Sequence, residues 1–425
     1  MRKSQLHRRM TTDQVVAIVK KFLAREISGV AAARHLEIGR TRLYELVGEY
    51  SRDKRSFTVD YDRHKANNRL DTDTEKVIIE ELKTEKKLII DNPLVPTKRH
   101  NYSYLAEELK RKHKITVSAP TIIARAKSHG FWKPQPKKKI HDREVITNYV
   151  GELIQHDSSL HLFAPNGTEK WYLTTSLDDH SRKIVFADFF LSETSWTNIY
   201  GVQSVVLHHG IPLSYYADQH PIYRYVKDRD KQRPGNIQYT KFTDNVITQW
   251  KRVLLDCGIK PLYALSPEAK GKIERPYGWI QDHVVRTCVR ENVIKISEGK
   301  EILKREINQY NNVRVHSTTM EIPNRRFENA LANKQSMFRP WKLPEPWTSP
   351  KDVFCLVDTR IVDAYRRISL HGVILTVPKV PPKYEVELRM CPNFKDSLIE
   401  IRFWFKGQCV GEQKVKMSDL PGVRF

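Results

Sequence analysis

Three carboxylates in the middle of the sequence have the residue type and the setting for metal-dependent phosphoryl transfer. Asp157 closes a run of strand-forming residues at 153–157, and Asp218 closes another at 213–218. Glu274 lies on a helix that is expected to begin after Ser266. Two Mg²⁺ ions about 4 Å apart activate an oxygen nucleophile and offset charge at phosphorus, and Mg²⁺ prefers carboxylate oxygens. Strand ends and the first turns of a covering helix could bring these three groups together.

Basic residues accompany Glu274. Lys270 and Glu274 are four residues apart, so a helix places them on one face, and Arg275 follows directly. We therefore expect Lys270 and Arg275 to contact a phosphate backbone. Other polar residues here predict no second site. Asp178 and Asp179 suit a hairpin turn, no phosphate-cradling Gly-Lys loop occurs, and four histidines lack zinc-ligand spacing: His156, His180, His220 and His316.

The carboxylates fall in a segment, residues 146–333, that must fold so as to position them. Its periodicity predicts strands at 150–157, 171–177, 183–191, 213–218 and 260–265. It predicts helices at 194–209, 246–257, 300–315 and 323–333, and one after Ser266. Strands that give way to strand–helix alternation indicate a mixed α/β sheet.

Residues 1–55 predict a DNA-binding domain. They contain three helical patterns, with Gly39 in the turn before the third helix and Arg40 and Arg42 on its outer face. A short helix, a glycine-bearing turn and a helix with exposed arginines follow the helix-turn-helix plan. An ordinary three-helix bundle would show the same pattern.

Residues 70–132 repeat this plan and predict a second helix-turn-helix domain. Its third helix begins at Ser118, buries Ile122 and Ala126, and leaves Arg125 facing outward. A linker rich in proline and lysine follows at 133–145. Its lysines are expected to contact DNA phosphates: Lys137, Lys138 and Lys139.

The end of the chain, residues 350–425, turns to short β patterns. Strands are predicted at 353–356, 367–370, 373–377, 384–390, 399–405 and 408–415. Their spacing predicts a small antiparallel barrel of the SH3-like kind. Its basic residues could hold DNA or a second subunit: Arg366, Arg367, Lys379, Lys383 and Lys395.

The net charge and the cysteines indicate the kind of partner and the cellular compartment. Among 425 residues, 73 Lys and Arg against 50 Asp and Glu give a net charge of +23, which favours a polyanionic partner. Residues 1–142 hold 32 basic and 18 acidic side chains, so DNA contacts are expected there first. The five cysteines are scattered, and neither a signal peptide nor a membrane span is evident. A cytoplasmic protein that binds nucleic acid and has no membrane partner is expected.

Several motifs resemble bacterial insertion-sequence transposases of the DDE type, whose core is similar to that of retroviral integrases. They are GELIQHDS at 151–158, LDDHSR at 177–182, the stretch from Gly210 to His220, SPEAKGKIER at 266–275 and YNNVRVHS at 310–317. The resemblance implies a multidomain α+β chain: N-terminal helix-turn-helix units, an RNase H-like mixed α/β catalytic core and a C-terminal small β-barrel.

The resemblance also implies an activity. Water attacks at the end of a mobile element and frees a 3′-OH, which then attacks target DNA. Asp157, Asp218 and Glu274 would hold two Mg²⁺ ions, with Mn²⁺ able to substitute. The DNA partners would be the element's terminal inverted repeats and the target. Joining two ends implies a homodimer or a higher oligomer.

The sequence departs from retroviral integrases in three places. The interval from Asp218 to Glu274 is longer, which fits a polar insertion around 223–243. Asp244 is an alternative to Asp218, although Asp218 stands at strand distance from Gly210. Pro276 follows Glu274 by two residues, where it should kink the helix or mark a late start.

Two other functions use the same features. A domesticated transposase acting as a non-catalytic DNA-binding regulator would keep the basic N-terminus, but loss of catalysis tends to remove at least one of the three carboxylates. A metal-dependent nuclease without strand transfer would keep all three, and the sequence does not separate it from a transposase.

Overall fold

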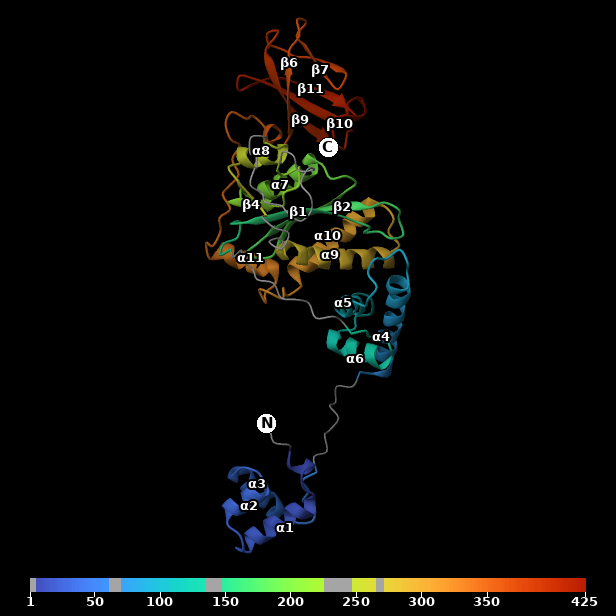
Figure 1. The fold of residues 1–425 in the computed structure, drawn as a ribbon, viewed down its shortest axis with the longest axis vertical. Helices are drawn as coiled ribbons and strands as arrows, with labels where there is room; N and C mark the ends of the chain where they lie inside the picture. Colours follow the sequence, from blue (N-terminus) through green and yellow to red (C-terminus); the bar gives the residue numbers. More distant parts are fainter. Residues whose placement is uncertain (1–4, 61–69, 135–146, 225–246, 265–270) are drawn as a thin grey trace, which may run out of the picture. The chain divides into compact units, whose positions relative to one another are not determined.

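The structure, a computed structural model, describes residues 5–60, 70–134, 147–224, 247–264 and 271–425, with the backbone alone for 271–276. The chain divides into two compact units, Met1–Glu75 and Lys76–Phe425. Figure 1 draws both units.

The first unit contains three helices that follow the expected pattern. They are α1 (Thr12–Leu23), α2 (Gly29–His35) and α3 (Arg40–Arg52), after a 3-10 turn, η1 (Leu6–Arg8). Thr11 and Gln14 form a capping box on α1, and the Ser28 hydroxyl accepts from the Ala31 amide at the start of α2. The helices enclose a small apolar core that includes Val19, Leu36 and Leu43.

The second unit is built on a five-stranded sheet. The strands are β1 (Ile154–His161), β2 (Trp171–Asp178), β3 (Ile184–Phe190), β4 (Ser214–Ala217) and β5 (Lys260–Tyr263), in the order β3-β2-β1-β4-β5. The strands β1, β2 and β3 are antiparallel, whereas β4 runs parallel to β1 and β5 parallel to β4. The expectation of a mixed α/β sheet is therefore confirmed.

Helices cover both faces of this sheet (Figure 1). On one face lie α7 (Ser195–His209) and α8 (Gln249–Asp256), and on the other lie α9 (Gly271–Arg290), α10 (Ile296–Asn312) and α11 (Pro323–Ala332). The helix α9 continues through Pro276, and its Tyr277, Ile280 and Val284 are buried in a core shared with β2 and β3. In the ranges described, no helix is both long and apolar enough to cross a bilayer.

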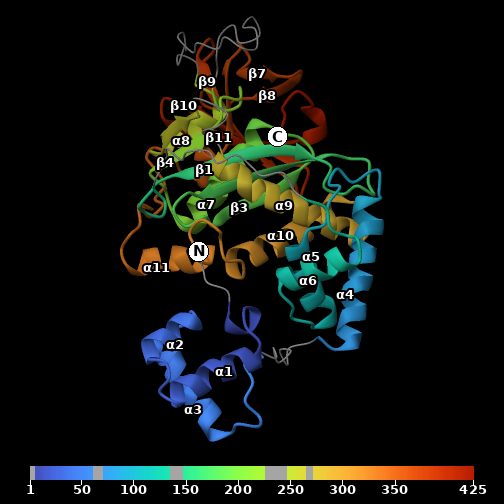
Figure 2. The ribbon, with the colours of Figure 1, turned by 60° about the horizontal axis from the view of Figure 1, so that its bottom comes forward.

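A helical segment packs against α9 (Figure 2). It consists of α4 (Thr72–Glu85), one π-helical turn η2 (Lys86–Ile90), α5 (Tyr102–His113) and α6 (Ala119–Ser128). As expected, the Ser118 hydroxyl caps α6, and Ile122 and Ala126 are buried. The contact with α9 combines apolar packing of Ile89 and Val95 with buried ion pairs. Arg286 and Arg290 of α9 are almost fully buried, and both pair with Glu85 at the end of α4.

The last part of the chain corrects two expectations. Residues 353–356 were predicted to be a strand, but Ser349 caps a short helix, α12 (Pro350–Val353), and the first strand, β6 (Leu356–Ile361), begins later. Further strands are β7 (Arg367–Leu370), β8 (Val373–Thr376), β9 (Glu385–Asn393), β10 (Leu398–Phe405) and β11 (Gln408–Lys416), followed by a 3-10 turn, η5 (Met417–Asp419).

These strands form two antiparallel sheets, a four-stranded one in the order β11-β10-β9-β6 and the pair β7-β8. Within this fully described part of the chain, β11 and β6 remain edge strands, so the sheet does not close into a barrel. The edge β6 also contacts α8, because Gln249 donates to the Val357 carbonyl at 2.7 Å and accepts from the Val357 amide at 2.9 Å.

Candidate active site

Two of the three predicted carboxylates lie on neighbouring strands. The parallel pairing of β1 and β4 matches Ile154 with Tyr215 and Gln155 with Tyr216. The same register, continued by two residues, sets Asp157 opposite Asp218. Both side chains are half-buried. The sheet therefore brings together at one edge two carboxylates that are far apart in the sequence.

The position of Asp157 differs from the prediction. We expected the first strand to cover 150–157 and to end at Asp157, whereas β1 runs from Ile154 to His161. Antiparallel pairing with β2 supports β1 as far as His161, opposite Trp171, but its parallel neighbour β4 ends at Ala217. Asp157 thus stands where β1 loses one neighbour, and this leaves space beside it.

Asp218 is held by the turn that ends β4. One of its carboxylate oxygens accepts a hydrogen bond from the His220 amide at 2.8 Å, as in an Asx-turn. The next residue, Gln219, is buried and donates to the Ala264 carbonyl at the end of β5, at 2.8 Å. These bonds fix the chain after β4 and hold Asp218 at the sheet edge.

The helix that carries Glu274 is anchored at Asp157. The Tyr277 hydroxyl of α9 donates to the Asp157 carbonyl at 2.5 Å and accepts from the Thr175 hydroxyl at 2.7 Å. Burial, followed by the charge of Asp157, raises the pKa of Tyr277. Glu274 precedes Tyr277 by three residues on the same helix. Its side chain lies outside the described part of the structure.

A fourth carboxylate, Glu193, was missed by the sequence reasoning. It stands between β3 and α7, next to the N-cap Thr194. Burial raises its pKa, His220 lowers it, the charges of Asp218 and Asp157 raise it, and a hydrogen bond with Ser158 lowers it. Glu193 is therefore within electrostatic reach of both predicted carboxylates. Its only local signal, an acid before a helix N-terminus, is common and not specific.

Buried polar groups connect β1 with α7 by hydrogen bonds. Tyr223 donates to Asn198 of α7 at 2.8 Å, and burial raises its pKa, as do the charges of Glu193, Asp157 and Asp218. His156, next to Asp157, is fully buried and lies 2.9 Å from both Ser176 and Asn198. These contacts give His156 a structural position on the side of β1 opposite the carboxylates.

The hairpin acids behave as expected of turn residues. Asp178 accepts from the Gly151 and Ser181 amides, both at 2.8 Å, and burial raises its pKa. Asp179 is buried and pairs with Arg182 at 2.8 Å. Their oxygens bond within the β2–β3 turn and also tie it to Thr147, Gly151 and Gln155.

The predicted DNA-contacting residues are dispersed. Arg40 and Arg42 are exposed on α3 of the first unit, where Arg42 pairs with Glu45 at 2.9 Å and Glu49 at 3.1 Å. Arg125 is half-buried on α6. The remaining predictions lie outside the described residues or side chains: Lys137, Lys138, Lys139, Lys270, Arg275, the alternative Asp244 and most of the 223–243 insertion.

The chemistry of the described donors suits a hard cation. Asp157 and Asp218 offer carboxylate oxygens, with no thiolate or imidazole between them, and Mg²⁺ prefers such ligands. Over the described residues, no group of three or more His, Cys, Asp or Glu is placed to hold a metal ion. A complete site would therefore need a ligand from outside the described side chains, and Glu274 is the candidate.

The sequence is similar to two proteins that are named as transposases. The chain is 26% identical over 236 residues to a protein named as a transposase, y4bF, of Sinorhizobium fredii, covering 55% of this chain and 46% of that one. It is 28% identical over 174 residues to the transposase for insertion sequence IS1202 of Streptococcus pneumoniae, covering 41% and 35%. No family model matches. The predicted resemblance to insertion-sequence transposases is thus confirmed, although the match spans less than half of either relative.

Among solved structures, the chain is similar to the catalytic core domain of the integrase of HTLV-2, described in complex with magnesium. The identity is 13% and the TM-score 0.31, over 42% of this chain and 97% of the other.

Proposed function

We propose that the protein is a DNA transposase that binds the terminal inverted repeats of a mobile element, cleaves its 3′ ends and joins them to target DNA. The observation that carries the proposal is the parallel pairing of β1 with β4, because its register, continued by two residues, sets Asp157 opposite Asp218. The sequence similarity to two transposases supports it.

In this proposal the core is RNase H-like. The mixed sheet, with strand order β3-β2-β1-β4-β5 and both antiparallel and parallel neighbours, supports this. Asp157, Asp218 and Glu274 are the proposed catalytic residues and would hold two Mg²⁺ ions, or Mn²⁺ in their place. Bound there, the ions would supply an activated oxygen nucleophile and charge stabilisation at phosphorus.

Other residues of the chain would position the proposed catalytic carboxylates. Tyr277 bonds α9 to β1 at Asp157, and Glu274 precedes Tyr277 by three residues on the same helix, which supports the proposed role of Glu274. The His220 amide occupies one oxygen of Asp218, which restricts how that carboxylate turns. Preorganised groups of this kind reduce the entropy that must be lost when the DNA end and the target are aligned.

DNA binding is assigned to the basic helical parts. We propose that α2 and α3 form one helix-turn-helix unit, with Arg40 exposed for base or phosphate contact, and that α5 and α6 contribute a second. The lysines at 137–139 and the residues Lys270 and Arg275 complete the proposed contacts. Two bound ends require at least a dimer.

A strand-transfer assay tests the proposal. Purified protein is incubated with a labelled duplex from the DNA that flanks the gene, a plasmid target and Mg²⁺. Joined product is expected, and it should vanish with EDTA and in Asp157→Asn, Asp218→Asn and Glu274→Gln. Asp188→Asn is the matched control, because Asp188 is a carboxylate of the same sheet that lies away from the proposed site. Its partner is Lys300, at a distance of 3.0 Å.

The other outcomes separate the alternatives. Tight binding to the flanking duplex without nicking or joining, in Mg²⁺ or Mn²⁺, would establish a DNA-binding regulator. Nicking without joining would establish a nuclease. Joining that survives Asp218→Asn but not Asp244→Asn would move the second carboxylate to Asp244.

A further inference from the structure

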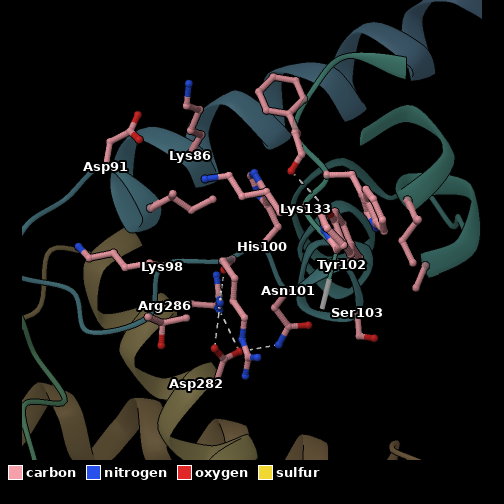
Figure 3. A pocket seen from close by; sticks show the side chains of 18 of the residues that line it. Lys86, Asp91, Lys98, His100, Asn101, Tyr102, Ser103, Lys133, Asp282 and Arg286 are labelled. Carbon is pink, nitrogen blue, oxygen red and sulfur yellow. Dashed lines mark hydrogen bonds and ion pairs between the residues drawn. The ribbon is translucent and has the colours of Figure 1, made fainter. Parts of the chain in front are cut away.

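A cavity of about 1070 Å³ lies where the helical segment meets α9 (Figure 3). Its walls come from η2, from the loop before α5 and the start of α5, from α6 and the residues after it, and from the stretch of α9 between Gly278 and Arg286. All of these elements belong to the second unit. The cavity is separate from Asp157 and Asp218 but shares α9 with the proposed site.

The cavity is cationic. Five of its lining residues are Lys or Arg, and two are carboxylates: Lys86, Lys98, Arg99, Lys133 and Arg286 against Asp91 and Asp282. Asp282 and Arg286 pair with each other at 2.8 Å, so the net positive charge comes from Lys86, Lys98, Arg99 and Lys133 against Asp91. The lysines are exposed at the rim. An anionic ligand is therefore favoured over a neutral or cationic one.

Aromatic rings line the same cavity. Tyr102 is stacked on His100 with ring centroids 5.9 Å apart, and Phe131 meets His100 edge-on at 5.9 Å. Trp132 is 39% exposed. Burial and the charges of Arg286 and Lys86 lower the pKa of His100 to about 4, so its ring is neutral near pH 7. Flat, uncharged rings beneath a basic rim are the combination that binds single-stranded nucleic acid.

We propose that this cavity binds an unpaired nucleotide of the DNA end, with its base against the aromatic rings and its phosphates on the rim lysines. Bases in a duplex are stacked on each other and have no free face, whereas an extruded or overhanging base can enter a pocket and stack on a side chain. The inference rests on the proposed function only in assigning the nucleotide to the element's end.

A larger residue at position 278 should fill the cavity without disturbing its walls. Gly278 is an exposed helical residue that lines the cavity, and a Cβ there would meet no atom within 4 Å. A side chain at this position should not disturb packing, and replacing a helical glycine stabilises the helix. Gly278→Leu would occupy the cavity, and Gly278→Ala is the matched control.

The test measures binding in EDTA, so that catalysis plays no part. The full chain is titrated by fluorescence anisotropy against three duplexes of one sequence: blunt, with a three-thymidine overhang, and with three abasic nucleotides in place of the thymidines. The thymidine tail is expected to tighten binding roughly tenfold over the blunt duplex and over the abasic tail. Gly278→Leu should abolish that gain and leave blunt-duplex binding unchanged, whereas Gly278→Ala should keep it.

Photo-crosslinking locates the nucleotide. A 5-iododeoxyuridine in the overhang should crosslink to Tyr102, Phe131 or Trp132, and Lys86→Ala should weaken tailed binding more than Lys87→Ala, its exposed neighbour outside the cavity. Equal binding of all three duplexes, equal binding of thymidine and abasic tails, or crosslinks elsewhere would overturn the proposal. Failure of strand transfer with tail-dependent binding intact would count against the proposed function and not against this pocket.

Discussion

Removal of one buried glutamate should loosen the helical segment from the core. Glu85 is fully buried at the end of α4 and pairs with Arg286 and, at 2.7 Å, with Arg290, both on α9. In Glu85→Ala the guanidinium groups of Arg286 and Arg290 remain buried but have lost the carboxylate of Glu85. Breaking a buried pair by removing one partner costs about 3–5 kcal/mol. Arg286 keeps Asp282 and Arg290 keeps Glu81, so we expect the low end, about 3 kcal/mol.

Hydrogen exchange measures this effect locally, which suits a chain with more than one compact unit. Backbone amides of α4 that exchange through undocking should exchange about a hundredfold faster in Glu85→Ala, because 1.36 kcal/mol corresponds to a factor of ten. Glu80→Ala is the matched control on the same helix. Its pair with Lys83 is 68% and 58% exposed, and such pairs contribute little. Rates for Glu85→Ala within threefold of those for Glu80→Ala would refute the role of the network.

Three further outcomes follow from particular contacts. Tyr277→Phe removes the donor to the Asp157 carbonyl and should slow strand transfer about tenfold with DNA affinity unchanged. The lost hydrogen bond should also lower the free energy of unfolding by about 1 kcal/mol. Equal strand-transfer rates would show that this bond does not position α9. Gly299→Ala would place a Cβ 2.3 Å from Trp171 and should destabilise the second unit by about 1–3 kcal/mol. Gly278→Ala meets no atom and should not destabilise it, and denaturant midpoints of the two variants measure the difference. The pKa of His100 is lowered from 6.5 to about 4, so its contribution to stability is complete above pH 6.5 and is lost as the pH falls toward 4; His100→Gln should reduce this loss in denaturant titrations.

Local patterns predicted the elements well where the cause is local. The cap at Ser118, the helix over residues 195–209 and the β2–β3 hairpin depend on neighbours a few residues away, and the structure has them at or near the predicted positions. The error at 353–356 has a local cause that was overlooked. Ser349 and Pro350 form a helix start with Asp352, and this outweighed the β-propensity of the valine and phenylalanine that follow.

Features that depend on tertiary contacts were not predicted. The extension of β1 to His161 follows from its pairing with β2, and no local signal marks it. Glu193 approaches Asp157 and Asp218 only because the turn after β3 leads back toward them. The burial of Arg286 and Arg290 was not predicted either, since arginine in a helix is normally exposed and the ion pairs with the glutamates of α4 form only in the folded chain. Sequence reasoning therefore predicted the pair Asp157 and Asp218 but not the residues that surround it.

The helix α9 connects the proposed chemistry with the proposed binding. Glu274 and Tyr277 lie near its start, Gly278 and Trp279 line the cavity, and Arg286 and Arg290 attach the helical segment. Only about 18 Å separates residues 274 and 286 along a helix that rises 1.5 Å per residue. Because hydrogen bonds within the helix keep these positions in fixed relation, a DNA end held by the helical segment is held at a set distance from Asp157. Loosening at Glu85 should then lower joining more than binding, whereas loss of the cavity should lower tail-dependent binding and leave the anchoring of α9 at Asp157 intact.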